Sequence, residues 1–286
     1  MRHAVTVTGL PAWMDLPRLL GPTGDGLDDG EGWIREAMAD GTLAMSASME
    51  TRRAADLDAR LRGLGFGGHA IAVTSAPPLP RGAVRDARTQ DARRRRDTTP
   101  GFTRTGTRLD EEGRWSLTPE HLALALGRRA SRAFGEGAHV VDAGCGAGGN
   151  SIGLARAGLR VTAIEQDAAR LGMARHNARV YGVEARVRFV HGDALALLPG
   201  LLEGAEPPAM VFLDPPWGTA WDRAATPVSA LPLLPSVLEL AGGRVATWAK
   251  LPPSAVLDLP GLTRCEAWFG EAEGDRRRVK FVLACA

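Results

Sequence analysis

Four consecutive residues, Asp214-Pro215-Pro216-Trp217, carry the groups needed to hold an aromatic ring and its amino group. They directly follow the apolar run Ala209 to Leu213, which is typical of a buried strand. An amino group on a purine or pyrimidine is a poor nucleophile because its lone pair is delocalised into the ring. The Asp214 carboxylate can accept one amino hydrogen and the Pro215 carbonyl the other, while Trp217 stacks on the ring. This stretch therefore predicts methyl transfer to an exocyclic amine, with Pro216 completing the turn and with no metal or covalent intermediate.

A glycine-rich turn earlier in the chain predicts the site of the methyl donor. It reads Asp142-Ala143-Gly144-Cys145-Gly146-Ala147-Gly148-Gly149 and follows the apolar pair Val140-Val141. Gly144 and Gly146 let the backbone turn sharply and approach a nucleoside closely. Asp142 at the strand end suits the amino group of an amino acid. The spacing differs from the G-x-G-x-x-G pattern of dinucleotide sites, which counts against NAD, the main alternative.

Two further acids end the next two predicted strands. Glu165 is placed where a carboxylate can accept both ribose hydroxyls, and Asp193 where one can accept the adenine amine; Asp193 alone could also cap a helix. Together with Asp142, these acids match the ammonium, ribose and adenine of S-adenosylmethionine in order. We therefore predict that this row of strand ends binds S-adenosylmethionine.

Apolar runs alternate with helical patterns from residue 115 onward, which predicts a parallel, doubly wound sheet. Expected strands lie at 140–141, 161–164, 187–190, 210–213 and 245–248, with helices near 149–157, 168–181, 194–203 and 229–241. Another helix should begin at Thr118-Pro119-Glu120, with the Thr118 hydroxyl as its N-cap. Segments 262–269 and 278–284 leave no room for a helix between them. They predict an antiparallel pair at the sheet edge.

The first part of the chain divides differently. Residues 1–80 predict a small α+β domain, with strands at 4–8 and 70–74 and helices at 32–39 and 52–64. Residues 81–114 predict an arginine-rich linker or arm, and residues 115–286 the catalytic domain. From Arg81 to Arg108 there are nine arginines and three aspartates, a net charge of +6, so the remainder carries −4 of the total of +2.

Arginine is the usual cation of this chain, since lysine occurs only at Lys250 and Lys280. Guanidinium groups match phosphates bidentately, so the arginine segment favours contact with an RNA backbone. A solvated charged helix is the alternative.

The three cysteines have no metal-ligand spacing and cannot all pair with one another; they are Cys145, Cys265 and Cys285. They predict a reduced, cytoplasmic protein without a metal site, and Cys145 is expected to be a small buried residue of the turn rather than a nucleophile. No apolar run of ~18 residues is present, so neither a membrane span nor a secretory signal is expected.

These motifs resemble the RNA cap guanine-N2 methyltransferases, the trimethylguanosine synthases, within the Rossmann-like S-adenosylmethionine-dependent methyltransferases. The matching stretches are 109–112, 115–120, 141–150, 174–182 and 211–218. The resemblance covers about residues 101–286. It implies a Rossmann-like α/β fold, a seven-stranded methyltransferase sheet that is mostly parallel with an antiparallel last strand. It also implies guanine-N2 methylation, with Trp217 on the base and the donor held by residues matching Asp142, Glu165 and Asp193.

Two departures from the family concern the acceptor. Many members carry Ser where this chain has Asp214, so its amine contact is closer to that of nucleic-acid amino methyltransferases generally. The family's Trp-Gly-Gly-Pro-Asp-Tyr becomes Trp217-Gly218-Thr219-Ala220-Trp221-Asp222, which loses a tyrosine associated with the cap phosphates. We therefore expect a guanine in uncapped, structured RNA. The alternatives are adenine-N6 methylation, N-methylation of a small molecule or peptide, and a non-catalytic RNA module that binds the donor.

Three other residues have open roles. Trp115 and Phe102 are expected either to cover the donor or to fill the core. Asn177 is expected to bond a helix to a loop rather than to act in catalysis. Trp217 itself could instead be a wall of the donor pocket.

Overall fold

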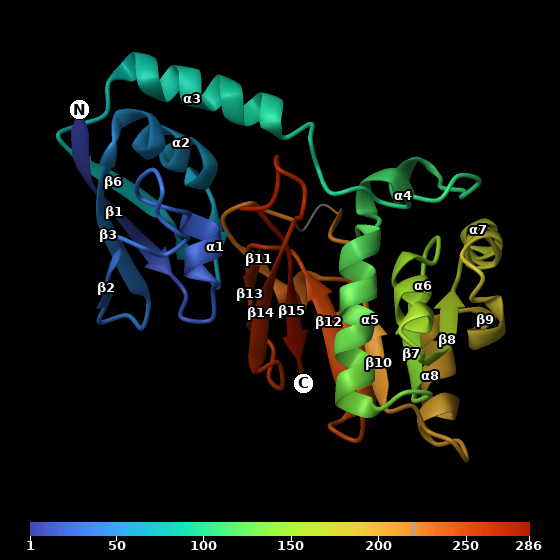
Figure 1. The fold of residues 1–286 in the computed structure, drawn as a ribbon. Coiled ribbons are helices and arrows are strands. Elements are labelled where there is room, and N and C mark those ends of the chain that lie inside the picture. Colours follow the sequence, from blue (N-terminus) through green and yellow to red (C-terminus); the bar gives the residue numbers. More distant parts are fainter. Residues whose placement is uncertain (219–220) are drawn as a thin grey trace.

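The computed structural model describes residues 1–218 and 221–286. Thr219 and Ala220, part of the departure from the family's tryptophan motif, lie outside the described residues. Figure 1 shows a smaller N-terminal sheet beside a larger sheet formed by the later part of the chain, with the long helix α3 (Arg81–Arg94) running along the top from the first towards the second.

The larger sheet has seven strands in the order β14-β15-β12-β10-β7-β8-β9. They are β7 (His139–Ala143), β8 (Arg160–Glu165), β9 (Val187–His191), β10 (Met210–Leu213), β12 (Ala246–Leu251), β14 (Arg264–Phe269) and β15 (Val279–Cys285). Only β15 runs antiparallel to its neighbours, and the other adjacent pairs are parallel. The predicted fold class is confirmed, including the antiparallel pair at the edge.

Helices cover both faces of this sheet, because successive strand residues point to opposite sides. Val140 and Phe212 are buried under α5, α6 and α7, whereas Val141 and Val211 are buried under α8 and α9. The bounds of these helices are α5 (Glu120–Phe134), α6 (Gly149–Arg156), α7 (Ala168–Val180), α8 (Ala194–Leu202) and α9 (Leu234–Ala241). The carboxyl ends of the parallel strands are therefore left open to loops, which is where ligands bind in such sheets.

Two predicted helix starts were wrong. Pro119, not Thr118, is the N-cap of α5, and it makes no side-chain capping bond; the Thr118 hydroxyl instead donates to Asp214. The helix expected over 229–241 begins with a short 3₁₀ turn, η3 (Val228–Ala230), and α9 starts only at Leu234. Leu233 has φ 67°, a left-handed conformation that interrupts helical geometry between the two.

Residues 2–76 form the smaller sheet, whose order is β2-β3-β1-β6 with every adjacent pair antiparallel. In chain order its elements are β1 (Arg2–Leu10), α1 (Leu16–Leu20), β2 (Ile34–Ala37), β3 (Leu43–Glu50), α2 (Thr51–Leu61) and β6 (Ala72–Ala76). This β-α-β-β-α-β order is the split βαβ, or ferredoxin-like, arrangement. Its helices bury one face, while the other face presents small polar side chains such as Thr6 and Ser46, which hydrogen-bond at 3.0 Å.

The helix predicted at 32–39 was wrong, because these residues contain strand β2. The turn at Asp40-Gly41 allows β2 to pair with β3, with Gly41 at φ 82°. The helix predicted at 52–64 is confirmed as α2, three residues shorter at its end. The pairing partner β3 was not identified from the sequence, and without it the local apolar spacing of Trp33, Ile34 and Ala37 suggested a helix.

The first part of the arginine segment is helical. Helix α3 packs on α2 through Ala55, Ala59 and Ala87, and most of its arginines are exposed. No helix among residues 1–218 and 221–286 is both long enough and apolar enough to cross a membrane.

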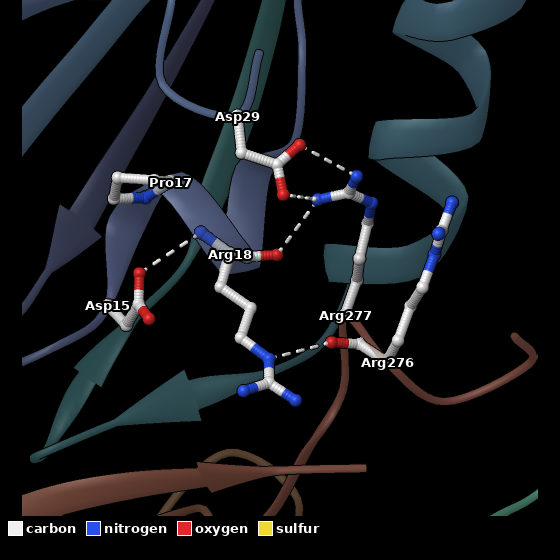
Figure 2. A pocket seen from close by; sticks show the side chains of 6 residues that line it. All are labelled: Asp15, Pro17, Arg18, Asp29, Arg276 and Arg277. Atoms are coloured by element: carbon white, nitrogen blue, oxygen red, sulfur yellow. Dashed lines mark hydrogen bonds and ion pairs between the residues drawn. The ribbon is translucent and has the colours of Figure 1, made fainter. Parts of the chain in front are cut away.

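The N-terminal unit is joined to the β14–β15 loop by arginines. The Arg277 guanidinium donates to the Arg18 carbonyl at 3.1 Å and to the Asp29 carboxylate, while Arg18 donates to the Arg276 carbonyl (Figure 2). Arg18 also donates to the Gly270 carbonyl at 2.8 Å. These charged groups line a pocket of about 410 Å³ between the two units. Such contacts fix the loop 270–278 relative to the smaller sheet.

A second contact reaches the segment that follows Trp217. The short hairpin of β4 (Gly65–Phe66) and β5 (His69–Ala70) lies against it, and the Gly65 amide donates to the Arg223 carbonyl at 3.1 Å. A Cβ at Gly65 would lie 1.8 Å from the Ala224 carbonyl oxygen. Only glycine allows the two backbones to approach this closely.

Gly65→Ala should therefore separate the hairpin from residues 223–224 and lower the free energy of unfolding by about 1–3 kcal/mol, as overpacking does. Denaturant unfolding measures the loss, and hydrogen exchange should show faster exchange at residues 221–226. Gly82→Ala is the matched control, because a Cβ there meets no atom within 4 Å. Equal stability of the two variants would contradict the close contact.

Candidate functional site

The four acids predicted to form the site are brought to one edge of the larger sheet. Asp142, Glu165 and Asp214 stand at or directly after the carboxyl ends of β7, β8 and β10, and Asp193 follows β9. These strands are neighbours, in the order β10-β7-β8-β9. Acids that are far apart in the sequence therefore lie in a row along one edge of the sheet.

The glycine-rich turn is held by its own backbone. Gly144 and Gly146 have φ 98° and 54°, and the amides of Gly144 and Cys145 donate to the Ile164 carbonyl at 3.0 and 2.8 Å. A Cβ built at Gly144 or Gly146 meets no atom within 4 Å. The turn thus leaves open space over its backbone, as a site for a closely held ligand requires.

Asp142 is fully buried and only partly satisfied. Its Oδ2 accepts a hydrogen bond from the Ser151 hydroxyl at 2.5 Å, but its Oδ1 is buried with no hydrogen-bond partner among the described residues. Burial raises the pKa of Asp142 to about 7, and the nearby Asp214 and Glu165 carboxylates add to the rise. An orphaned acceptor in a negatively charged pocket is suited to a cationic ligand such as an ammonium group.

Glu165 and Asp193 have structural tasks in the donor-free protein. Glu165 is buried, and its two oxygens accept from the Gly146 amide at 2.8 Å and the Asp167 amide at 2.9 Å. Asp193 caps α8 by accepting from the Leu195 amide at 2.9 Å. Each carboxylate has further lone pairs available, so these bonds brace the acids without using all their acceptor capacity.

Three described residues donate hydrogen bonds to the Asp214 side chain, all to the same oxygen. Oδ2 accepts from Lys250 Nζ at 2.6 Å, from Asn150 Nδ2 at 3.0 Å and from the Thr118 hydroxyl at 3.4 Å. In the part of the chain that the structure describes, no donor contacts Oδ1. The carboxylate is therefore held firmly by one oxygen, and the other remains able to accept.

Lys250 is the functional residue that sequence reasoning missed. It lies on β12, is 5% exposed, and places Nζ 5.5 Å from the centre of the Trp217 ring. The sequence did contain a signal that could have drawn attention to Lys250, because only two of the 35 Lys and Arg residues are lysines.

The residues after Asp214 differ in burial. Pro215 is buried, Pro216 is exposed and Trp217 is half-buried, packing against the hydrophobic clusters on both sides of the sheet. The Trp217 indole N–H is buried without a hydrogen-bond partner among the described residues. Trp217 thus belongs partly to the core and partly to the site edge.

The upstream residues mostly organise the edge of the site. Glu120 accepts from Thr103, Tyr181 and Arg156, and despite the opposing effect of burial these hydrogen bonds lower its pKa to about 2. Phe102 contacts the Tyr181 ring in a tilted arrangement, with ring centroids 5.4 Å apart, and packs on the core. Trp115 is 87% exposed, so the core-filling alternative was wrong for it, and covering the donor stays a prediction.

Two minor expectations are confirmed by the contacts. Asn177 bonds helix α7 to loops, accepting from the Arg108 amide at 2.7 Å and donating to the Ala147 carbonyl at 2.9 Å. Cys145 is buried, and burial beside acidic groups raises the pKa of its thiol, which leaves it a poor nucleophile. No group of His, Cys, Asp or Glu suited to a metal ion occurs within residues 1–218 and 221–286.

The segment that carries most of these site residues is similar to a known protein family. Residues 137–222 match the RNA cap guanine-N2 methyltransferase family. The match contains three of the stretches on which the resemblance was predicted, 141–150, 174–182 and 211–218, and does not reach the upstream stretches 109–112 and 115–120. It confirms that resemblance for residues 137–222.

Individual relatives cover only parts of the chain. Trimethylguanosine synthase of Schizosaccharomyces pombe is 36% identical over 40% of this chain and 47% of its own length. Ribosomal RNA small subunit methyltransferase J of Alkalilimnicola ehrlichii is 34% identical over 57% of this chain and 58% of its own length. Among solved structures, an RNA methyltransferase from Salinibacter ruber in complex with S-adenosyl-L-homocysteine shares 19% identity over 59% of this chain and 90% of its own, with a TM-score of 0.35. The chain spans about half the length of these two curated relatives.

The raised pKa of Asp142 predicts a pH effect on stability. Between its ordinary value of 3.8 and the folded value of about 7, the folded protein holds a proton that the unfolded chain has released. The free energy of unfolding should therefore fall as the pH rises from about 4 to about 7. Asp142→Asn removes this ionisation. The donor-free variant should gain stability relative to the parent at about pH 8, with about 4 kcal/mol as the upper bound, and little at about pH 4.

The same variant should bind S-adenosylmethionine more weakly, because an ammonium group prefers an ionised carboxylate. Denaturant unfolding at both pH values measures stability, and calorimetry measures donor affinity. Parental donor affinity in Asp142→Asn would remove Asp142 from the donor site.

Proposed function

We propose that this protein is an S-adenosylmethionine-dependent RNA methyltransferase that acts on an exocyclic amine, guanine N2. The observation that carries the proposal is the carboxylate of Asp214, held through Oδ2 and left able to accept at Oδ1, beside the buried Asp142, whose Oδ1 has no hydrogen-bond partner among the described residues. Neither feature contributes to folding stability in an obvious way. Both features suit the binding of two ligands that meet at this edge of the sheet, an amine at Asp214 and a cationic group at Asp142.

The donor would lie over the glycine-rich turn. Asp142 would hold its ammonium group, Glu165 its ribose hydroxyls and Asp193 its adenine amine, with Gly144 and Gly146 leaving room for the nucleoside. When bound, S-adenosylmethionine supplies an electrophilic methyl group on a sulfonium. The net negative charge of the three carboxylates Asp142, Glu165 and Asp214, opposed by Lys250, also favours a cationic donor.

The acceptor would lie at the end of β10. Asp214 Oδ1 accepts one amine hydrogen, the Pro215 carbonyl accepts the other, and Trp217 stacks on the base, so the amine lone pair is turned towards the donor side. Lys250 has no acceptor lone pair and donates to Oδ2, which holds that oxygen on the Lys250 side and leaves Oδ1 able to accept. Lys250 is thus a positioning residue for Asp214.

The finer choice of guanine N2 is supported by the family match and by the relative named trimethylguanosine synthase. The altered residues after Trp217 support an uncapped, structured RNA. Nucleoside mass spectrometry of RNA from a deletion strain and its parent tests the proposal. The deletion should remove N2-methylguanosine from one RNA fraction. Loss of N6-methyladenosine instead would favour the adenine alternative, and unchanged RNA would reject an RNA substrate.

The orientation of Asp214 gives a sharper test. Asp214→Ala would leave the buried Lys250 ammonium, Asn150 and Thr118 without their shared hydrogen-bond acceptor, whereas Asp214→Asn keeps an acceptor oxygen and nearly the same shape and is therefore the better variant. Its amide oxygen should stay on the Lys250 side, where three donors require an acceptor, and its NH2 should face the substrate amine. Single-turnover methylation should fall at least about 100-fold, because the amine is then misplaced.

Lys250→Met in the Asp214→Asn background should restore part of this loss. Without Lys250 the amide can turn over, since Asn150 Oδ1 is a buried acceptor with no partner among the described residues and the Thr118 hydroxyl can also accept. We expect the double variant to be about tenfold faster than Asp214→Asn. Calorimetric donor affinity is the control and should be nearly unchanged. A double variant no faster than Asp214→Asn would show that Lys250 does not orient residue 214.

A further inference from the structure

Two arginine-rich segments that are far apart in the sequence form one surface, which we name the arginine ridge. It consists of Arg93 to Arg96 at the end of α3 and Arg276 to Arg278 in the β14–β15 loop. Arg278 donates to Asp91, 187 residues away, in an ion pair. Figure 1 shows the end of α3 above the β14–β15 loop.

Buried polar contacts lock these two segments together. The Thr99 amide and hydroxyl both donate to Asp275 at 2.8 Å, and Asp275 is 1% exposed. A Cβ at Gly274 would lie 2.1 Å from the Arg94 carbonyl oxygen and 2.0 Å from that of Asp97. Specific buried contacts therefore hold the two segments of the ridge together.

Part of the positive charge of the ridge is neutralised within the protein. Asp91 pairs with Arg95 and Arg278, Asp29 with Arg277, and Asp56 with Arg94. Asp97 and Glu273 are exposed beside the ridge, and Glu271 faces His121.

Three arginines of the ridge remain available, namely Arg93, Arg96 and Arg276. All three are exposed, and none has an ion pair within the described part of the chain. Figure 2 shows the Arg276 side chain beside Arg277 with no interaction drawn to its guanidinium. Free guanidinium groups are the ones that release counter-ions on meeting phosphates.

The ridge lies at the same sheet edge as the acceptor site. Strands β14 and β12 are both antiparallel to β15, so β14 is parallel to β12 and β10, and the loop after β14 leaves from the carboxyl edge. Three strand spacings separate β14 from β10, which is roughly 15 Å. A strand of nucleic acid a few nucleotides long can bridge that distance.

Two exposed tryptophans accompany the acceptor site. Trp115 is 87% exposed and lies in α4 (Glu111–Ser116), just before Thr118, which contacts Asp214; Trp221 is 48% exposed and follows Trp217 closely. Exposed aromatic rings beside a basic surface are typical platforms for unpaired bases, whose stacking is sequence-tolerant. Paired bases would be unavailable to them.

We propose that the arginine ridge binds the phosphates of a single-stranded RNA segment whose bases stack on Trp115 and Trp221, and so guides the target nucleotide to Asp214. This inference rests on the proposed function for its choice of RNA. The ridge is assembled mainly from residues outside the segment that matches the family.

Binding of a fluorescein-labelled single-stranded oligoribonucleotide, measured by anisotropy over a series of salt concentrations without donor, tests the ridge. In R93Q/R96Q/R276Q the slope of log affinity against log salt should be smaller by about 2, since each lost phosphate contact removes roughly 0.7. The matched control is R128Q/R132Q/R188Q, which removes the same charge from exposed positions without ion pairs in the described residues. Its slope should be parental.

Trp115→Ala/Trp221→Ala should weaken binding at every salt concentration with an unchanged slope, because stacking releases no counter-ions. Equal slopes for the ridge and control variants would overturn the ridge, as would a parent that binds no oligoribonucleotide. Binding is measured apart from turnover. A protein that binds through the ridge but changes no RNA nucleoside would therefore refute the proposed reaction and leave the ridge standing.

Discussion

The cost of burying negative charge at one edge of the sheet is the constraint on which the rest of the site depends. Asp142, Glu165 and Asp214 lie at neighbouring strand ends, and burial, with a smaller effect of the Asp214 and Glu165 carboxylates, raises the pKa of Asp142. Two backbone amides donate hydrogen bonds to Glu165, and the Lys250 ammonium forms an ion pair with Asp214. Among the described residues, Asp142 has only Ser151 as a hydrogen-bonding partner, and its Oδ1 has none. A cationic ligand would offset this cost, so the residues that we propose to bind the donor reduce the stability of the fold at the place where they would act.

The ion pair of Lys250 and Asp214 couples several elements at that edge. It joins β12 to the end of β10, and Asn150 and Thr118 bring α6 and the start of α5 to the same oxygen. Because α6 follows the glycine-rich turn, the donor and acceptor sides share one hydrogen-bond network. Movement of the turn would therefore change the hydrogen bonds of Asp214. This link gives a physical way for the binding of one ligand to influence the binding of the other.

The N-terminal unit extends this arrangement to the outside of the sheet. Its ferredoxin-like topology leaves one face of small polar residues without aromatic rings, so stacking of bases has no platform on that face. Its contribution is instead to hold neighbouring segments in place: Gly65 touches residues 223–224, and Arg18 and Asp29 hold the β14–β15 loop. Through these contacts a unit remote from the chemistry can position both the segment after Trp217 and the arginine ridge.

The sequence by itself determined the seven-stranded sheet, the acids at its strand ends and the motif at Asp214, because hydrophobic periodicity and glycine turns are local properties. It did not determine strand β2, because the hydrogen bonds to its partner β3 outweigh the helical spacing of its apolar residues. It also did not determine the role of Thr118, whose hydroxyl donates to Asp214 and does not cap the helix. Lys250 and the arginine ridge were also decided by tertiary structure. Strand order and register bring Lys250 to Asp214, and Asp91 brings Arg278 to α3. Such long-range pairings depend on how whole elements pack, which no local pattern of residues encodes.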